Sequence, residues 1–345
     1  MLVASGRMKV FVAAVLFAEG LPKDDAAKVA ELMVAADLLG ADGHGVFRLP
    51  RYVARLRAGG FNPRPDIRVV SRRGASALID GDNGFGHLVM DSAVTLAEDI
   101  ARDQGVAWVG ARMSNHAGAG GVHALRLAEA GLVGIYLAVG NANHMAPWGG
   151  IELLLSTNPI AIAVPGQSEP VLLDMATTVA AYGKVKLAAD RGESMPEGWM
   201  IDREGNPLTD PTNVEGGSLM PIGGPKGFGL ALMFGFLAGT LNGAAFGSDV
   251  IDFNADDDSA TNTGQVLIAF DPSAFGSLAA FRAQVDAVRR EMTGSALRPG
   301  FDEIRLPGER ALGLRRARLQ DGIQLPNGLR GRLNGLAAEH GIDPL

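Results

Sequence analysis

The chain has 345 residues, 47% of them hydrophobic and 20% charged, and its formal net charge is −7. This is a globular composition, and without a run of lysine and arginine it argues against binding to nucleic acid, which needs concentrated positive charge. The sequence has no cysteine, which excludes disulfides, thiolate nucleophiles and cysteine-ligated metal sites. The first residues predict an amphipathic helix without the cleavage site of a signal peptide, so we expect a cytoplasmic protein.

The predicted secondary structure changes character twice along the chain. Apolar residues at spacings of three and four predict helices over residues 7–60, and helices return at the end of the chain. Between residues 67 and 282, short β-branched segments predict strands, with helices between them at 90–104, 121–131, 177–190 and 226–242. We expect a helical domain built from residues 1–70 and 283–345, and a mixed α/β domain over residues 71–282.

Within the N-terminal helical region, "ADGHGVFRLP" sets a histidine between two glycines. We expect Asp42 to cap a helix, with His44 and Arg48 on one face of it at i,i+4. The glycines leave room for a ligand beside the imidazole, and the planar guanidinium of Arg48 suits a carboxylate. The alternative is a surface histidine and an arginine paired with an acid.

The stretch "GVAWVGARMSNHAGAGGVHALRLAEAGLVGIYLAV" has the order strand, glycine-rich turn, helix, strand. It does not carry the dinucleotide-binding fingerprint, because His123 stands where the third glycine belongs and no acid ends the second strand. His116 follows the first strand in a polar turn, which is a usual position for a catalytic residue. The alternative is a loop histidine bonded by the backbone.

Two later segments predict anion binding. Asp174 ends a buried strand, and we expect Thr177 and Thr178 to open a helix whose free amides receive a phosphate or a carboxylate, or simply cap it. In "PIGGPKGFGLAL", glycines bracket Lys226 before a helix. This suits a phosphate although the spacing is not that of a Walker A motif, and a tight turn is the alternative.

The uncharged segment 227–248 resembles a membrane span, because Gly235, Gly239, Gly243 and Gly247 recur every four residues. Its modest hydrophobicity favours a buried helix, and we expect no membrane partner. We also expect no metal site. The acidic stretch 252–256 lacks key calcium-loop residues, and the histidines lack the spacing of a zinc motif.

Eight motifs occur in one order along nearly the whole chain: "GHGVFRLPRY", "SNHAGAGG", "APWGG", "STNPIAIAVP", "LLDMATT", "PEGWMIDREGNPLTDP", "PIGGPKGFGLAL" and "LPGE". The chain resembles the malate/L-lactate dehydrogenase-type family of NAD(P)-dependent oxidoreductases. That family includes ureidoglycolate, sulfolactate and diketogulonate enzymes and reductases of cyclic imino acids.

The resemblance implies a non-Rossmann mixed sheet domain that binds NAD or NADP, a helical domain built from both chain ends, and a homodimer. It places His44 and Arg48 at the substrate and makes His116 the acid/base residue. The segments that it implies for the cofactor are Asn141, Leu173, Asp174, Met175, Ala176, Thr177, Lys226, Pro307, Gly308 and Glu309. Two departures are Gly43, where the family usually has serine, and His123, where an aromatic residue is often seen.

We therefore expect hydride transfer between a nicotinamide and C2 of a small 2-hydroxy or 2-oxo acid of the malate or lactate type. We favour His116 for the proton, because the charge of Arg48 disfavours an imidazolium at His44. One alternative is reduction of a cyclic imino acid such as pyrroline- or piperideine-2-carboxylate. The alternative of another class is a non-catalytic ligand-binding or membrane-associated protein.

Overall fold

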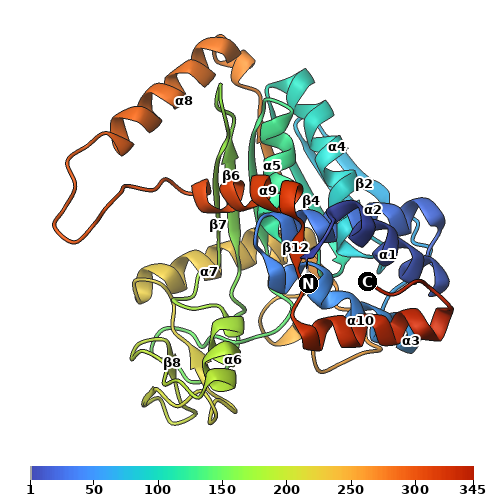
Figure 1. Cartoon of the computed structure of the whole chain (residues 1–345). Helices are drawn as coiled ribbons and strands as arrows, with labels where there is room; N and C mark the ends of the chain where they lie inside the picture. The colour runs from blue at the N-terminus through green and yellow to red at the C-terminus, as the bar shows by residue number, and fades with distance from the viewer. Residues whose placement is uncertain (1) are drawn as a thin grey trace.

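A seven-stranded mixed sheet forms the centre of the computed structural model, which describes residues 2–345 (Figure 1). The strand order is β2-β3-β4-β11-β5-β6-β7. Only β3 and β4 pair in parallel, and β11 returns from late in the chain to separate β4 from β5. The strands are β2 (Arg68–Arg73), β3 (Ser76–Asp80), β4 (Val106–Ser114), β5 (Val133–Ala138), β6 (Ile160–Val164), β7 (Val171–Met175) and β11 (Thr263–Phe270).

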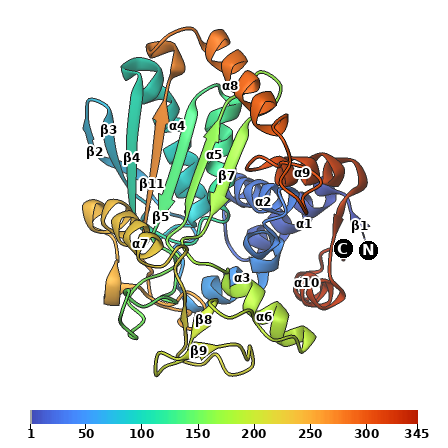
Figure 2. The ribbon, with the colours of Figure 1, turned by 90° about the vertical axis from the view of Figure 1, so that its left-hand side faces the viewer.

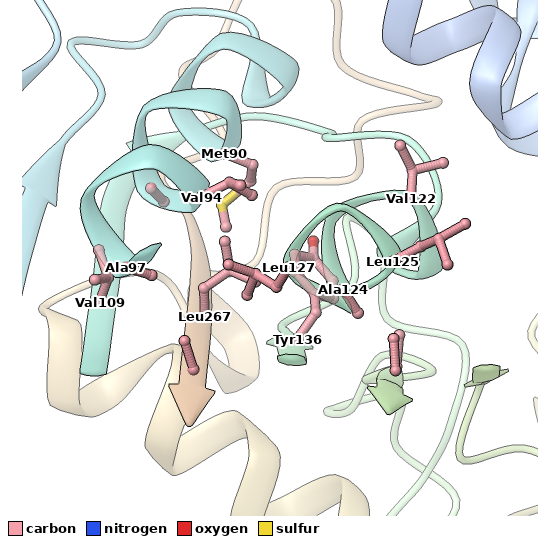
Figure 3. Packing of buried hydrophobic residues seen from close by; sticks show 14 of the residues in the cluster. Met90, Val94, Ala97, Val109, Val122, Ala124, Leu125, Leu127, Tyr136 and Leu267 are labelled. Atoms are coloured by element: carbon pink, nitrogen blue, oxygen red, sulfur yellow. The ribbon is translucent and has the colours of Figure 1, made fainter. Parts of the chain in front are cut away.

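Helices α4 (Gly86–Gln104) and α5 (Gly120–Glu129) cover one face of this sheet. Figure 3 shows side chains of the two helices, among them Val94 and Leu127, meeting Leu267 of β11 in the largest buried core. The apolar side chains between the two helices and the sheet are removed from water. This burial is the main term that stabilises such a layered domain. The prediction of a mixed α/β protein is confirmed.

Helix α7 (Pro225–Ala238) lies on the opposite face of the sheet (Figure 2). It ends at Ala238, four residues before the predicted end, and Thr240–Asn242 form a 3-10 turn. Its glycines serve close packing, because a Cβ at Gly235 would run into the ring of Phe246. No helix among residues 2–345 has the length and apolar character needed to cross a bilayer.

Both ends of the chain pack together beside the sheet domain. β1 (Leu2–Val3) pairs antiparallel with β12 (Ile323–Gln324). One buried cluster joins side chains from the first helices, such as Val12, to Leu333 near the end of the chain. The helices of this region are α1 (Ser5–Ala18), α2 (Lys23–Leu38), α3 (Leu49–Ala58), α9 (Glu309–Asp321) and α10 (Asn327–His340). The exact domain boundaries stay a prediction, and α8 (Leu278–Thr293) runs across the expected boundary at residue 283.

A small unit below the main sheet carries its own core. The strands β8 (Met200–Ile201), β9 (Pro207–Leu208) and β10 (Ser218–Leu219) form a three-stranded sheet. Helix α6 (Tyr182–Arg191) packs on it through Val185. The predicted helix over 177–190 therefore begins at Tyr182, and the prediction that Thr177 and Thr178 open it is wrong. Remaining 3-10 turns span Asp42–His44, Val46–Arg48, Gly247–Asp249 and Pro272–Ala274.

Candidate active site

The segment that carries His44 and Arg48 is not the regular helix that the sequence predicts. Two 3-10 turns, Asp42–His44 and Val46–Arg48, precede α3, which has Pro50 in its first turn. Proline favours the start of a helix and glycine disfavours its interior, so the α-helix begins only at Leu49. The expected capping role of Asp42 is also wrong, since its carboxylate pairs with Arg318 of α9.

The two glycines beside His44 have different roles. Gly45 is buried, and a Cβ at this position would overlap the carboxylate of Asp37. That carboxylate accepts a hydrogen bond of 2.9 Å from the N–H of Val46. Burial raises the pKa of Asp37 to about 7. A Cβ at Gly43 meets nothing within 4 Å, so only Gly45 is required by packing.

His44 and His116 lie in direct contact, although 72 residues separate them in the chain. Nδ1 of His44 is 3.1 Å from Nε2 of His116. The two rings are nearly parallel, with an interplanar angle of 9°. His116 follows β4 and is only 8% exposed, whereas His44 is exposed. The sequence predicted both residues for the site, and the structure brings them together.

Tyr52 holds the other side of the His116 ring. Its hydroxyl is 2.6 Å from Nδ1 of His116, and the N–H of Gly118 donates to the same nitrogen at 3.3 Å. A backbone N–H can only donate, so Nδ1 accepts and neutral His116 carries its proton on Nε2. This assigns the Nε2–H of His116 as the donor to Nδ1 of His44. Sequence reasoning missed Tyr52, whose only signal was its place in "GHGVFRLPRY", one turn after Arg48.

The surroundings of both imidazoles lower their pKa values and so favour the neutral form. Burial holds the pKa of His116 well below its ordinary value, and the positive charge of Arg48 lowers it further. Loss of hydration and the charge of Arg48 also lower the pKa of His44. Because one side of the His44 ring is exposed, the loss of hydration lowers its pKa less than full burial would. The sequence predicted that the charge of Arg48 keeps His44 neutral, and in the structure the same charge also lowers the pKa of His116.

Arg48 keeps its charge available for a ligand. Its Nε donates to the carbonyl of Gly43 and its Nη1 to Oδ1 of Asn254, both at 2.9 Å. Neither partner is charged, and Arg48 forms no ion pair with any of residues 2–345. The alternative of an arginine paired with an acid is therefore wrong. A cation held in place by neutral groups beside two neutral imidazoles attracts an anion.

The strand β7 and the "LPGE" loop lie against each other. The N–H of Leu172 donates to the carbonyl of Pro307 at 3.3 Å. Gly308 has φ +85°, and a Cβ there would clash with the backbone of Leu172. Glu309 begins α9. On the same strand, Asp174 accepts a 2.9 Å hydrogen bond from the N–H of Gly121 at the start of α5. The "LPGE" loop therefore lies against the Leu172 end of β7.

The start of α7 lies near the other end of β7. The N–H of Ile222 donates to the carbonyl of Thr177 at 2.9 Å, which places Lys226, exposed in the first turn of α7, near the end of β7. The helix N-terminus in this region thus belongs to α7. Thr177 has no free donor for a ligand, because its N–H and its hydroxyl both bond to Thr157 at 3.0 Å.

Other expected polar residues have structural partners. Asn141, which follows β5, donates from Nδ2 to the hydroxyl of Thr263 at 2.6 Å. His123 is buried against Tyr136, with Nε2 2.9 Å from the carbonyl of Ala117. His144 stacks on Tyr182 of α6, with the ring centroids 4.7 Å apart. Within residues 2–345, no group of three histidine, aspartate or glutamate side chains is arranged to hold a metal ion.

Comparison with known proteins places this geometry in a family. The family model described as malate/L-lactate dehydrogenase matches residues 3–334. Malate dehydrogenase of Pyrococcus horikoshii is 38% identical, over 99% of this chain and 96% of the relative. Its solved structure superimposes with a TM-score of 0.92 at 37% identity, covering 100% of this chain and 97% of that one.

Relatives differ in the substrate that their names give. The structure of a delta1-piperideine-2-carboxylate reductase from Pseudomonas syringae pv. tomato has a TM-score of 0.88 at 31% identity, covering 98% of this chain and 100% of that one. Ureidoglycolate dehydrogenase (NAD(+)) of Escherichia coli K12 is 37% identical over 84% of this chain and 82% of the relative. The non-catalytic alternative is therefore wrong, and this chain is an oxidoreductase that uses NAD or NADP. It belongs to the malate/L-lactate dehydrogenase family.

Proposed function

We propose that this enzyme transfers hydride between a nicotinamide and C2 of a small 2-hydroxy or 2-oxo acid of the malate or lactate type. The observation that carries the proposal is the guanidinium of Arg48, which has no ion-pair partner among the described residues, beside the His44–His116 pair. A carboxylate held by Arg48 brings the oxygen on C2 within reach of an imidazole, which is the arrangement that this reaction needs. When bound, the cofactor supplies the hydride acceptor or donor.

His116 is the proposed acid/base residue. Tyr52 fixes Nδ1, which leaves Nε2 as the nitrogen that faces the exposed His44. For oxidation, His116 moves its proton from Nε2 to Nδ1, which then donates to the oxygen of Tyr52 instead of accepting from it, and the freed Nε2 accepts the hydroxyl proton of the substrate. In reduction, the imidazolium returns a proton from Nε2 to the oxygen on C2. His44 exchanges its bond to His116 for the substrate oxygen, which its glycine neighbours and exposed position favour.

The residues proposed for the cofactor fit an anionic dinucleotide. The first-turn amides of α7 and the exposed cation of Lys226 match a phosphate chemically. Pro307 contacts β7 at Leu172, and the other end of that strand leads to Thr177, which bonds to Ile222 just before this helix. We assign residues 173–176 and 307–309, with Asn141 and Thr177, to cofactor binding. Thr177 would make only van der Waals contact with the cofactor, because its N–H and its hydroxyl are already bonded to Thr157.

A second candidate reaction is reduction of a cyclic imino acid, favoured by the piperideine-2-carboxylate reductase among the structural neighbours. Arg48 would hold the carboxylate in this reaction too. The two functions separate in one assay, in which a panel of 2-oxo acids and cyclic imino acids is followed by NADH and NADPH absorbance. Turnover of a 2-oxo acid at least tenfold above any imine supports the first proposal, and the reverse order overturns it.

We also propose a homodimer, in the cytoplasm. Leu230, Met233 and Phe236 are 44%, 49% and 45% exposed and follow one another at spacings of three along α7. An apolar helix face of this kind is typical of a protein interface. Analytical ultracentrifugation tests the proposal, since Met233→Asp should produce a monomer if α7 lies in the interface.

A further inference from the structure

An apolar groove lies between α8 and the outer end of the β6–β7 hairpin (Figure 1). Its volume is about 300 Å³, at the lower end of the range for small-molecule sites. Val164 and Val171, which pair across the two strands, line one side together with Leu306. The apolar lining from α8 consists of Phe281, Val285, Val288 and Met292. A groove of this size and character suits a flat, largely apolar group such as a purine ring.

The groove adjoins the segments proposed for the cofactor. Leu306 immediately precedes Pro307, whose carbonyl accepts a 3.3 Å hydrogen bond from the N–H of Leu172. Val171 begins β7, and the other end of this strand lies near the start of α7, which carries Lys226. The groove is therefore at the end of β7 opposite the cation proposed for the cofactor phosphates.

One arginine lines the groove, and its charge is already matched. The side chain of Arg289 on α8 is 19% exposed. Its guanidinium lies 3.9 Å from the carboxylate of Asp286 and 4.0 Å from that of Glu309. Its Nη1 also donates to the carbonyl of Glu169 at 2.7 Å. Hydrogen bonds from Ser168 hold the pKa of Asp286 below its ordinary value, so this carboxylate is ionised. One cation thus faces two anions.

The next charges along the loop keep this balance negative. Arg305, one residue before Leu306, pairs with Glu303. Two arginines and three carboxylates therefore surround this end of the groove, and their charges sum to −1. The 2′-phosphate that distinguishes NADP from NAD would bring more negative charge here, which is unfavourable. A ribose 2′-hydroxyl can instead donate to a carboxylate, which is how many dinucleotide sites recognise NAD.

We propose that the groove between α8 and the β6–β7 hairpin binds the adenine ring of the cofactor, and that Glu309 beside it selects NAD over NADP. The inference rests on the proposed cofactor site. Apolar side chains such as Val171, Val288 and Leu306 would contact the ring, and the carboxylate of Glu309 would accept from the ribose 2′-hydroxyl. Arg289 has no charge to offer a 2′-phosphate, because two carboxylates already hold it.

The first test measures binding without turnover. NADH and NADPH are titrated into the enzyme and followed by cofactor fluorescence. We expect NADH to bind about tenfold more tightly than NADPH, because the 2′-phosphate meets a net negative charge. Glu309→Gln removes that charge and keeps the size of the side chain, so it should reduce the ratio at least about threefold, mainly by tightening NADPH. Equal affinities in the wild type, or tighter binding of NADPH, overturn the selection by Glu309.

The second test fills the groove from α8. Val288 is 41% exposed, so Val288→Trp should fold. It should weaken NADH about tenfold, because the ring loses its apolar contact area, and leave reduced nicotinamide mononucleotide, which lacks the adenosine, within about twofold. Ala283→Trp, at an exposed position of α8 outside the groove, is the control and should change neither affinity.

The wild type supplies a check that needs no variant, because 5′-AMP should compete with NADH. Unchanged NADH affinity in folded Val288→Trp, an equal loss for the mononucleotide, or no competition by 5′-AMP overturns the adenine site. Altered sedimentation of Val288→Trp with unchanged NADH affinity would assign the groove to an interface between copies of this chain instead. Failure of every oxo acid as a substrate, with NADH bound as expected, would overturn the proposed reaction and leave this inference standing.

Discussion

The two halves of the proposed site are built in opposite ways. The proton site, made of His44, Tyr52 and His116, is joined by internal hydrogen bonds of 2.6 and 3.1 Å, and two of its three members are buried. The cofactor surface around β7 and α7 has one exposed cation, Lys226, and the carboxylates of Asp174 and Glu309. Proton transfer needs fixed geometry before the substrate arrives, whereas a dinucleotide can be held by many weak contacts. Substitutions should therefore cost far more in the first half than in the second.

The largest expected effect is at His116. His116→Asn should lower kcat by about 10²–10⁴-fold, because the acid/base group is lost. His44→Asn should act mainly through KM. Because the pKa of His116 is lowered, oxidation by the wild type should persist as pH falls below 6.5, while His116→Asn should show no titration of this group. The pH profile of kcat for both variants shows which histidine is the acid/base residue. A titration lost only in His44→Asn would reverse the two roles.

The second largest loss of activity is expected at Arg48. Arg48→Met should lower kcat/KM by about 10²–10⁴-fold, mostly through KM, because a charged partner of the substrate carboxylate is removed. Arg51→Met is the matched control, since that guanidinium is already bonded to Asp257 at 2.9 Å. Steady-state kinetics should leave KM of the control near the wild-type value. Equal losses in the two variants would mean that Arg48 only supports the fold.

The two glycines sharpen the comparison within the proton site. Gly45→Ala should destabilise the protein by about 1–3 kcal/mol, because the new methyl group overlaps the carboxylate of Asp37. Gly43→Ala should be close to neutral, since the space there is open. Urea unfolding measures both. A destabilised Gly43→Ala would show that the turn around His44 tolerates less change than its exposure indicates.

The smallest effect is expected on the cofactor surface. Lys226→Ala should weaken cofactor binding by about tenfold, because a charged hydrogen bond at an exposed position is partly screened by water. The substrate KM should hardly change. Titration of cofactor fluorescence at low and high salt checks this, and the difference between the two proteins should shrink as salt rises. A loss above 10³-fold would break the contrast between the two halves.

Much of this could be predicted from the sequence, for physical reasons that differ by residue. His44, His116 and Arg48 stand in local patterns of glycine, polar turns and helical spacing, which a sequence displays directly. Their mutual contact depends on tertiary packing, and so does the hydrogen bond between Tyr52 and His116, which the sequence does not display. The helix expected at Thr177 failed because a threonine that could cap a helix bonds to Thr157 of a neighbouring segment instead. Periodicity carries no information about such a partner.

The pairing of the two chain ends has a consequence for biosynthesis. His44 and Arg48 are made early, but Asp42 beside them is anchored by Arg318, and Leu2–Val3 pair with Ile323–Gln324. A contact between residues some 300 positions apart closes late, since the ribosome must first release the C-terminal helices. All seven strands of the central sheet, of which β11 is the last, are therefore synthesised before the helices that anchor the segment of the substrate clamp. Catalytic competence should appear only when the last helices dock.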